Sequence, residues 1–346
     1  MDNRVTIKDV AREAGVSIST VSRVMNNSAP VDETMRQRVL EAMELIGYTP
    51  NLVARSLKSN DSSLVAYVVS NTADPFFTNI SRAIEEVMYQ NGYRLINCST
   101  NFSKERERGI LQDLQQQRVR GIIINTVGNN DDVVASFSRT IPMVLSNRNI
   151  QSPGFCGDFV DYDNVGGVKK LVDHLASLGH TKIGFMNGPK YITTAMERYA
   201  GFCGGMRGIN INIDEKYPYA VHSENTFQMQ DGYDLAARLL TMEDPPTAII
   251  AAKTEMALGA LQYCRRNGIR IPKDLSLCCF GDIVHNDLMY VKMTCVHTDF
   301  EALGTRIGQM LLERSEEKDP GEPKLYNREA RFDTPLVVGE STAALG

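Results

Sequence analysis

Residues 6–26 read TIKDVAREAGVSISTVSRVMN, and this stretch decides how the N-terminal part of the chain folds. Thr6 is a suitable N-cap for a first helix, and Gly15 permits a tight turn after that helix. A second helix is predicted from Ser17 to Met25, with Ser17 as its cap. Two short helices joined by a glycine turn are typical of a helix-turn-helix, whose second helix enters the DNA major groove.

A third helix is predicted to start at Asp32 and to stop at Gly47. Its apolar stripe at helical spacing is predicted to be Met35, Val39, Met43 and Ile46. Three helices in about 45 residues make a minimal core, so residues 1–50 are expected to form a small separate domain.

The outward side of the second helix suits base reading. Arg23 can grip guanine with two hydrogen bonds, Ile18 can touch a thymine methyl group, and Ser19 can bond a groove edge. Ser22 also points outward. Hydroxyl and amide side chains that could hold phosphates are Thr6, Ser17, Asn26 and Thr34. The alternative is a three-helix bundle that binds a protein, with Arg23 merely solvated.

Charge alone does not decide between these alternatives. The whole chain carries a formal charge of −5, which argues against general polyanion binding. Residues 1–60 hold eight Lys/Arg and seven Asp/Glu, a balance of +1. DNA binding must therefore depend on where the charges lie.

The next segment, residues 51–60, reads NLVARSLKSN. Asn51 marks a helix start, but a helix of this length is marginal by itself. We expect it to order when paired with its twin on DNA, where Leu57 can wedge between base steps. The alternative is a plain linker.

The long remainder alternates short apolar strands with amphipathic helices, which predicts parallel sheets covered on both faces. Strands are predicted at 64–69, 94–98, 121–125, 143–146, 183–187, 248–252 and 275–280. Helices are predicted at 78–90, 104–117, 164–178, 229–241 and 255–267. Two such units fit the length, and the cleft between two lobes is the natural ligand pocket.

Several function classes are disfavoured. No apolar run reaches the roughly 18 residues that span a bilayer, and no apolar leader begins the chain, which indicates a cytoplasmic protein without a membrane partner. Cys278 and Cys279 lie in an apolar run and are interpreted as buried thiols. No metal constellation, cofactor motif, phosphate-binding glycine loop or nucleophile elbow is present, so an enzyme is not expected.

Ordered motifs along the chain identify a family. They are TIKDVAREAGVS, STVSRVMN, IGYTPNLVARSL, DPFF, RGIIIN, DYDNVGG, LGHTKIGFMNGP, ERYAGF, EMALGAL and IPKDLSL. Over essentially its whole length the chain resembles the lactose/galactose repressor family of bacterial transcription regulators. The resemblance implies a helix-turn-helix headpiece followed by a two-lobed, periplasmic-binding-protein-like sensor of doubly wound parallel sheets.

The resemblance also implies the domain limits. The headpiece is expected at 1–50, and a hinge helix and linker at 51–61, where Ala54, Ser56 and Leu57 match the family's Ala-x-Ser-Leu signature. The sensor and dimerisation domain is expected at 62–346. The chain should cross between lobes near 161, 293 and 325, which places the first lobe at about 62–161 and 294–325 and the second at about 162–293 and 326–346.

Residues that follow strands are candidates for the cleft. They are Asp74, Phe76, Phe77, Asn147, Arg148, Asp163, Asn164 and Arg198. In the family, positions matching Asp163 and Arg198 grip the polar groups of a small ligand. Three alternatives remain open: the two phenylalanines as core, Asp163 as a helix cap, and Arg198 as an ion pair between lobes.

The chain departs from the family at two places. Lys253 and Thr254 stand where members commonly carry Asn-Asp, and Gly281 with Asp282 stands where they commonly carry two Asp. The first hypothesis is an anionic effector, such as a sugar phosphate, a sugar acid or another carboxylate, held by Lys253, Arg198 and Lys190. The second is a pocket that has lost its ligand, with Lys253 paired to Asp163.

Together these observations predict a sequence-specific DNA-binding regulator, a repressor of carbohydrate-related genes controlled by a small ligand in the inter-lobe cleft. A homodimer on a pseudo-palindromic operator is expected, because the C-terminus lacks the leucine heptads of tetrameric relatives. The alternatives are a regulator whose degenerate pocket does not respond to a sugar, and a solute-binding protein, against which the headpiece argues.

Overall fold

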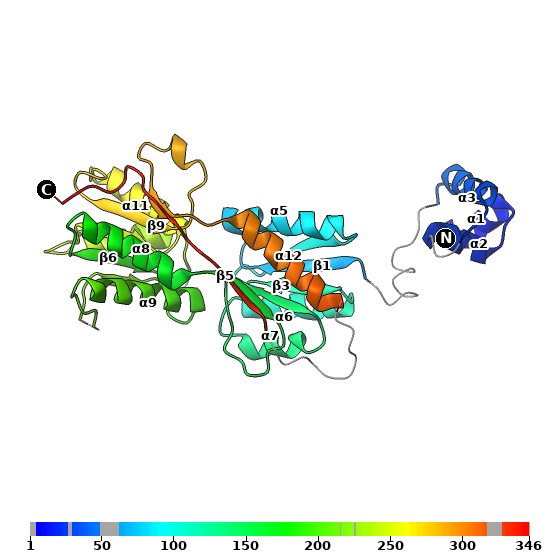
Figure 1. Ribbon diagram of the computed structural model, residues 1–346, viewed down its shortest axis with the longest axis horizontal. Coiled ribbons are helices and arrows are strands. Elements are labelled where there is room, and N and C mark those ends of the chain that lie inside the picture. Colours follow the sequence, from blue (N-terminus) through cyan, green and yellow to red (C-terminus); the bar gives the residue numbers. More distant parts are fainter. Residues whose placement is uncertain are drawn as a thin grey trace. The chain divides into compact units, whose positions relative to one another are not determined.

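The computed structural model describes residues 5–26, 30–48, 62–214, 216–224, 226–316 and 327–345. The chain splits into two compact units, Met1–Ser62 and Ser63–Gly346. The described residues of the first unit form three helices, and the second unit contains two α/β lobes (Figure 1).

In the first unit, α1 spans Ile7–Ala14, α2 spans Ile18–Asn26 and α3 spans Glu33–Leu45. Gly15 ends α1 in the left-handed conformation with φ 61°, as the predicted turn requires. The core consists of Val10, Ala11, Ala14, Val21, Val24, Val39 and Ala42. Met35, predicted in this stripe, is 45% exposed, because Val39 and Ala42 provide the buried contacts of α3.

The first lobe of the second unit is built on one parallel sheet. Its strands are β1 (Leu64–Val69), β2 (Arg94–Ser99), β3 (Gly121–Ile124), β4 (Met143–Ser146), β5 (Asp158–Tyr162) and β11 (Glu329–Phe332). Their order is β11-β5-β4-β3-β1-β2. The helices of this lobe are α5 (Pro75–Gln90), α6 (Lys104–Gln116), α7 (Asp131–Ser138) and α12 (Phe300–Glu316).

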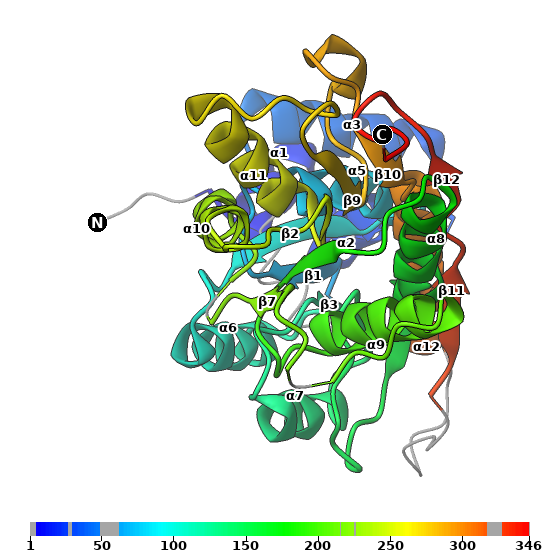
Figure 2. The same cartoon turned by 90° about the vertical axis from the view of Figure 1, so that its left-hand side faces the viewer.

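The second lobe repeats this plan. Its strands are β6 (Ile183–Asn187), β7 (Ala220–His222), β8 (Ala248–Ala251), β9 (Ser276–Phe280), β10 (Thr294–Val296) and β12 (Leu336–Val337), in the order β12-β10-β9-β8-β6-β7. Only β12 is antiparallel to its neighbour among the described strands. Helices α8 (Asn164–Ser177) and α9 (Thr193–Gly208) lie on one side of the sheet, and α10 (Met229–Leu240) and α11 (Thr254–Arg266) on the other (Figure 2). A short 3-10 helix, η1, spans Asn286–Leu288.

The predicted fold class, two doubly wound lobes with an N-terminal helix-turn-helix, is confirmed. Two of the three expected crossings are displaced. Strand β10, expected in the first lobe, pairs with β9 in the second sheet, and β11, expected in the second lobe, pairs with β5 in the first. The chain therefore crosses after Tyr162, between β10 and α12, and between β11 and β12.

The predicted strands and helices of the sensor are found within a few residues of their expected limits. Helices α7, α9 and α12 and strands β7, β10, β11 and β12 were not predicted. Helix α9 begins at Thr193. Its apolar and small residues give little amphipathic contrast, so its sequence gives a weak helix signal.

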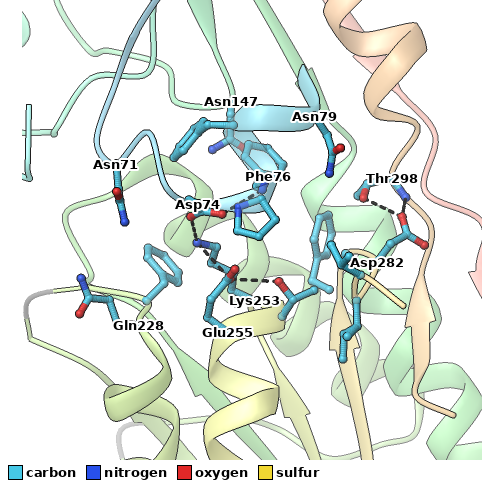
Figure 3. Close-up of a pocket in the computed structure, with 18 of the residues that line it drawn as sticks. Asn71, Asp74, Phe76, Asn79, Asn147, Gln228, Lys253, Glu255, Asp282 and Thr298 are labelled. Atoms are coloured by element: carbon cyan, nitrogen blue, oxygen red, sulfur yellow. Dashed lines mark hydrogen bonds and ion pairs between the residues drawn. The ribbon is translucent and has the colours of Figure 1, made fainter. Parts of the chain in front are cut away.

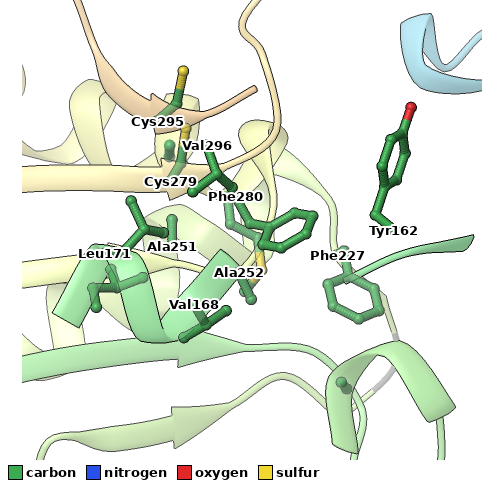
Figure 4. Close-up of a cluster of buried hydrophobic side chains, with 14 of the residues drawn as sticks. Tyr162, Val168, Leu171, Phe227, Ala251, Ala252, Cys279, Phe280, Cys295 and Val296 are labelled. Carbon is green, nitrogen blue, oxygen red and sulfur yellow. The ribbon is translucent and has the colours of Figure 1, made fainter. Parts of the chain in front are cut away.

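The second lobe has a dense apolar core that reaches the inter-lobe side (Figure 4). Phe185 of β6 stacks on Phe202 of α9 with ring centroids 4.8 Å apart. Cys278 and Cys279 are fully buried, as predicted, and all seven cysteines are free thiols. In the part of the chain that the structure describes, no helix is long and apolar enough to cross a bilayer. The same residues contain no cluster of His, Cys, Asp and Glu that could hold a metal ion.

Candidate functional site

The residues predicted to read bases lie on the exposed side of α2. Ile18 is 45% exposed although it is apolar, and Ser19 and Arg23 are exposed as well. Ser22 is half-buried. Val21 and Val24 of the same helix face the core. The structure thus separates a buried and an exposed face of α2, and the base-reading role of the exposed face stays a prediction.

The residues predicted to contact phosphates also lie at helix starts. The Thr6 amide and hydroxyl both donate to Asp9 Oδ2, at 2.9 and 2.7 Å. Ser17 Oγ accepts a hydrogen bond from the Thr20 amide at 3.1 Å and so caps α2. Thr34 is exposed in the first turn of α3. The side chain of Asn26 and the hinge residues Asn51, Ala54, Ser56 and Leu57 lie outside the described part of the structure.

The principal cavity of the second unit lies between the two lobes and has a volume of about 420 Å³ (Figure 3). It opens at the carboxyl ends of the strands of both sheets, where ligands bind in doubly wound folds. Residues Ser70, Asn71, Asn147 and Arg148 come from the first lobe, and Lys253, Gly281 and Asp282 come from the second.

Most of the residues named for the cleft from the sequence line this cavity. They are Asp74, Phe76, Phe77, Asn147, Arg148, Arg198, Lys253 and Asp282. The lining does not include Asp163, Asn164 or Lys190. Asp163 is the N-cap of α8 and accepts from the Gly166 amide at 2.8 Å, away from the cavity lining. Lys190 is exposed after β6 and does not line the cavity either, because the chain turns outward there before α9 begins.

Two buried guanidinium groups share the cleft. Arg148 Nη1 donates to the Thr126 carbonyl at 2.9 Å, while its buried Nε has no partner. Arg198 donates to Asn164 Oδ1 at 2.8 Å and to the Ala252 carbonyl at 2.6 Å. Burial lowers the pKa of each arginine to about 10. Among the described residues, no carboxylate lies within ion-pair distance of either guanidinium, although Glu107 attracts Arg148, and Asp161 and Glu197 attract Arg198, from farther away. The two cations could therefore bind an anion in the cleft.

The partners of Arg198 decide one open alternative. Asn164, Ala252 and the ring of Phe280 all belong to the second lobe. The interpretation of Arg198 as an ion pair between lobes is therefore wrong. Its guanidinium is held in the wall of the second lobe and directed at the cleft.

Lys253 has carboxylate partners other than the one expected. Its Nζ lies 2.5 Å from Asp74 Oδ2 and 3.1 Å from Glu255 Oε2. Pairing with Asp163 is therefore not found, because Asp163 is engaged at the start of α8. Lys253 is neutralised by two carboxylates and is not available as the main anchor for an anion.

Asp282 is also occupied. It accepts from the Thr298 amide and hydroxyl at 2.6 and 2.9 Å and from His297 Nδ1 at 3.0 Å. These contacts hold the Asp282 carboxylate against His297 and Thr298, which lie in the segment that crosses to the first lobe after β10. The preceding Gly281 has φ 97°, a conformation that side-chain-bearing residues rarely adopt. The Asp that family members commonly carry there is thus replaced by a residue suited to this backbone.

The walls of the cleft are aromatic, which the sequence analysis did not anticipate beyond Phe76 and Phe77. Phe76 meets Phe77 and Phe300 edge to face, at 5.1 and 5.7 Å between centroids. Further lining residues are Phe102, Thr194, Phe227, Met229, Glu255, Phe280 and Met289. Phe280 ends β9, so the rule that cleft residues follow strand ends could have found it.

A buried carboxylate lies behind Arg198, where the chain first crosses between lobes. Asp161 is 1% exposed and accepts from the Tyr162 amide and from Asn164 Nδ2, both at 2.7 Å. Burial raises the pKa of Asp161 to about 8, and nearby Glu197 adds to that rise. Glu197 in turn pairs with Arg331 of β11, with N–O distances of 2.9 and 3.1 Å.

Comparison with protein families agrees with this arrangement. Residues 6–51 match the family described as bacterial regulatory proteins, lacI family. Residues 172–342 match the periplasmic binding protein-like domain.

Individual proteins are similar over nearly the whole chain. The HTH-type transcriptional repressor PurR of Haemophilus influenzae strain PittEE is 35% identical over 345 residues, covering 98% of this chain and 99% of that protein. The protein of the same name from Mannheimia succiniciproducens is 33% identical over 317 residues, 91% of this chain and 93% of its own.

Solved structures give the same result. The lac repressor dimer bound to operator and the anti-inducer ONPF has a TM-score of 0.84 and 27% identity, covering 99% of this chain and 100% of that one. The CelR–cellobiose complex has a TM-score of 0.72 and 26% identity, covering 98% and 100%. The similar proteins are repressors rather than enzymes. The chain belongs to the lacI family of bacterial regulatory proteins and is a DNA-binding transcriptional regulator controlled by a small ligand.

Proposed function

We propose that the protein is a repressor that binds a pseudo-palindromic operator as a homodimer. The outward side of α2, with Ile18, Ser19, Ser22 and Arg23, reads each half-site. Contacts to the DNA phosphates come from Thr6, Ser17, Asn26 and Thr34. The segment from Asn51 through Ala54, Ser56 and Leu57 forms the paired hinge. The relatives named as transcriptional repressors support this proposal.

The controlling ligand is a small anion in the cleft between the lobes. The observation that carries this statement is the pair of buried arginines, Arg148 and Arg198, which have no ion-pair partner among the described residues. A buried cation without a carboxylate is costly unless an anion reaches it. The proposed anchor of the anion is therefore Arg148 with Arg198, whereas the sequence suggested Lys253, Arg198 and Lys190. Lys253 is neutralised by two carboxylates, and Lys190 lies outside the cavity lining.

The class of anion is a sugar phosphate, a sugar acid or another carboxylate. The phenylalanine walls provide an apolar surface for the body of the ligand, and Asn147 Oδ1, buried without a partner, can accept from a hydroxyl. Ligand binding changes the angle between the lobes. This change is transmitted to the hinge and so alters the affinity for operator DNA. A ligand that binds one lobe arrangement more tightly than the other shifts their populations.

Two measurements test the proposal on the full chain. In a gel shift at moderate salt, the protein should bind DNA from upstream of the neighbouring genes in preference to unrelated DNA. Calorimetry should then detect binding of sugar phosphates or acids and not of the matching neutral sugars. Binding of a neutral sugar that is unaffected by changes at Arg148 and Arg198 would contradict the anion, and absence of any DNA preference would contradict the repressor.

A further inference from the structure

An ion pair in the cleft joins the two lobes directly. Asp74 precedes α5 in the first lobe, and Lys253 precedes α11 in the second. The side chains are only 10% and 22% exposed, and the Nζ of Lys253 reaches Asp74 across the cavity (Figure 3). The contact therefore links the N-terminus of α5 in the first lobe to the N-terminus of α11 in the second lobe.

The carboxylate of Asp74 is oriented by its own helix. Its Oδ1 accepts from the Phe76 amide at 2.9 Å, which caps α5. This bond leaves Oδ2 directed at the cleft, where Lys253 meets it. Because the cap holds the carboxylate in place, little side-chain freedom is lost when the ion pair forms.

Lys253 stands where its own helix does not favour it. It is the N-cap residue of α11 and makes no side-chain cap hydrogen bond. A cation is unfavourable at the positive end of a helix dipole, and Ser, Thr, Asp or Asn would be preferred there. Glu255, in the first turn of α11, lies with its Oε2 3.1 Å from Lys253 Nζ and offsets part of this cost. The carboxylate of Asp74, on the other lobe, gives the lysine its second partner.

Another ion pair between the lobes, among the described residues, has a different position. Arg331 and Glu197 meet at the crossing segments, next to Asn164. Covalent connections already hold the lobes together there. Lys253 and Asp74 instead meet in the cavity, where a bound ligand would otherwise supply the contacts between lobes.

We propose that the Lys253–Asp74 ion pair holds the lobes closed in the absence of ligand. The ligand-free protein then spends most of its time in a closed arrangement, and a ligand must either fit beneath this pair or break it. The inference concerns lobe closure alone, so it stands or fails separately from the identity of the ligand.

Hydrogen–deuterium exchange of the full-length protein without ligand tests the proposal. The variants are Lys253→Met, which keeps the aliphatic stem, Asp74→Asn, which keeps an N-cap oxygen for the Phe76 amide, and the double variant. The matched control is Lys182→Met, because Lys182 pairs with Asp244 within the second lobe. Exchange is followed in the two cleft walls, residues 70–79 and 226–233.

Each single variant should raise exchange in both walls on the order of fivefold, the effect of a partly exposed ion pair. The double variant should exchange no faster than either single variant, because only one contact is lost. High salt should raise exchange in the unsubstituted protein toward that of the variants. The proposal would be overturned if exchange in the cleft walls of the single variants equalled that of Lys182→Met. Additive effects of the two substitutions in the double variant would overturn it as well.

Discussion

The guanidinium of Arg198 lies over the ring of Phe280, with Cζ 4.0 Å from the ring centroid. Phe280 ends β9 and is only 3% exposed, so the ring forms a rigid support. Stacking and two hydrogen bonds orient the guanidinium plane, and a planar fork is what two-point recognition of a carboxylate or phosphate requires. The guanidinium is thereby held in the orientation that the proposed anionic ligand would require.

Replacing Arg198 with Lys should weaken binding of an anionic ligand by at least about tenfold, although the charge is kept. Lysine cannot stack on Phe280 and donate to Asn164 and Ala252 together. Calorimetry with a sugar phosphate or acid measures the change, and Arg207→Lys near the end of the same helix is the control. If affinity instead depends on Lys253→Ala and ignores Arg198, the anchor is the lysine after all.

Replacing Arg23 with Ala should remove about 1–3 kcal/mol of discrimination between operator and unrelated DNA. The side chain is exposed on α2 and packs against none of the core residues of the headpiece, so the fold should survive. Fluorescence anisotropy with both DNAs measures the two affinities. Arg12→Ala on α1 is the control, since that arginine pairs with Asp9. An unchanged ratio in Arg23→Ala would mean that another residue reads the guanine.

Gly259→Ala should destabilise the second unit by roughly 1–3 kcal/mol, the usual cost of overpacking. A Cβ at Gly259 of α11 would lie 2.0 Å from the Met229 carbonyl of α10, so the two helices that carry this wall of the cleft must separate. Urea unfolding measures the loss. Gly204→Ala in α9 is the control, because no described atom outside its immediate neighbours and its own helix backbone lies within 4 Å of the Cβ position. That change should stabilise the protein by about 0.5–1 kcal/mol.

The contribution of Asp161 to stability should fall as pH rises between about 4 and 8. Burial raises the pKa of Asp161 from 3.8 to about 8, so the folded state binds a proton that the unfolded state has released. The contribution is greatest below pH 4 and is lost as pH rises through 8. Between pH 5 and 7 this contribution should fall by about 1.4 kcal/mol per pH unit.

Urea unfolding of the unsubstituted protein and of Asp161→Asn across this range isolates the contribution. The variant has no titrating group at this position, so its slope with pH should be smaller. Glu197, Arg198 and Arg331 face the same carboxylate and are present in both proteins. Equal slopes would show that Asp161 stays ionised in the folded protein.

Most of the fold could be predicted from local patterns. The turn at Gly15, the cap Asp32 of α3 and the apolar strand at 64–69 each depend on residues close together in the sequence. Local backbone preference and burial periodicity determine such elements. Strand β11 shows the limit, because its four residues, Glu329–Phe332, give no signal of the sheet that they join.

Which residues belong to the candidate site could be predicted from their positions directly after strands. The partners of these residues could be predicted less well. Asp74, Asn147 and Arg198 were expected at the cleft and line it. Asp163 follows a strand in the same way, yet its carboxylate caps α8. Both outcomes fit the sequence pattern equally well, since a side chain at a helix start can turn to the backbone or to the cavity.

By itself, therefore, the sequence determined the family, the order of elements and the edge of each sheet where polar side chains gather. Only the tertiary structure decided that Lys253 meets Asp74, 179 positions away, and that Arg148 and Arg198 line one cavity. The reason is physical: periodicity reports which face of an element is buried, whereas the partner of a charge depends on how two distant elements are brought together.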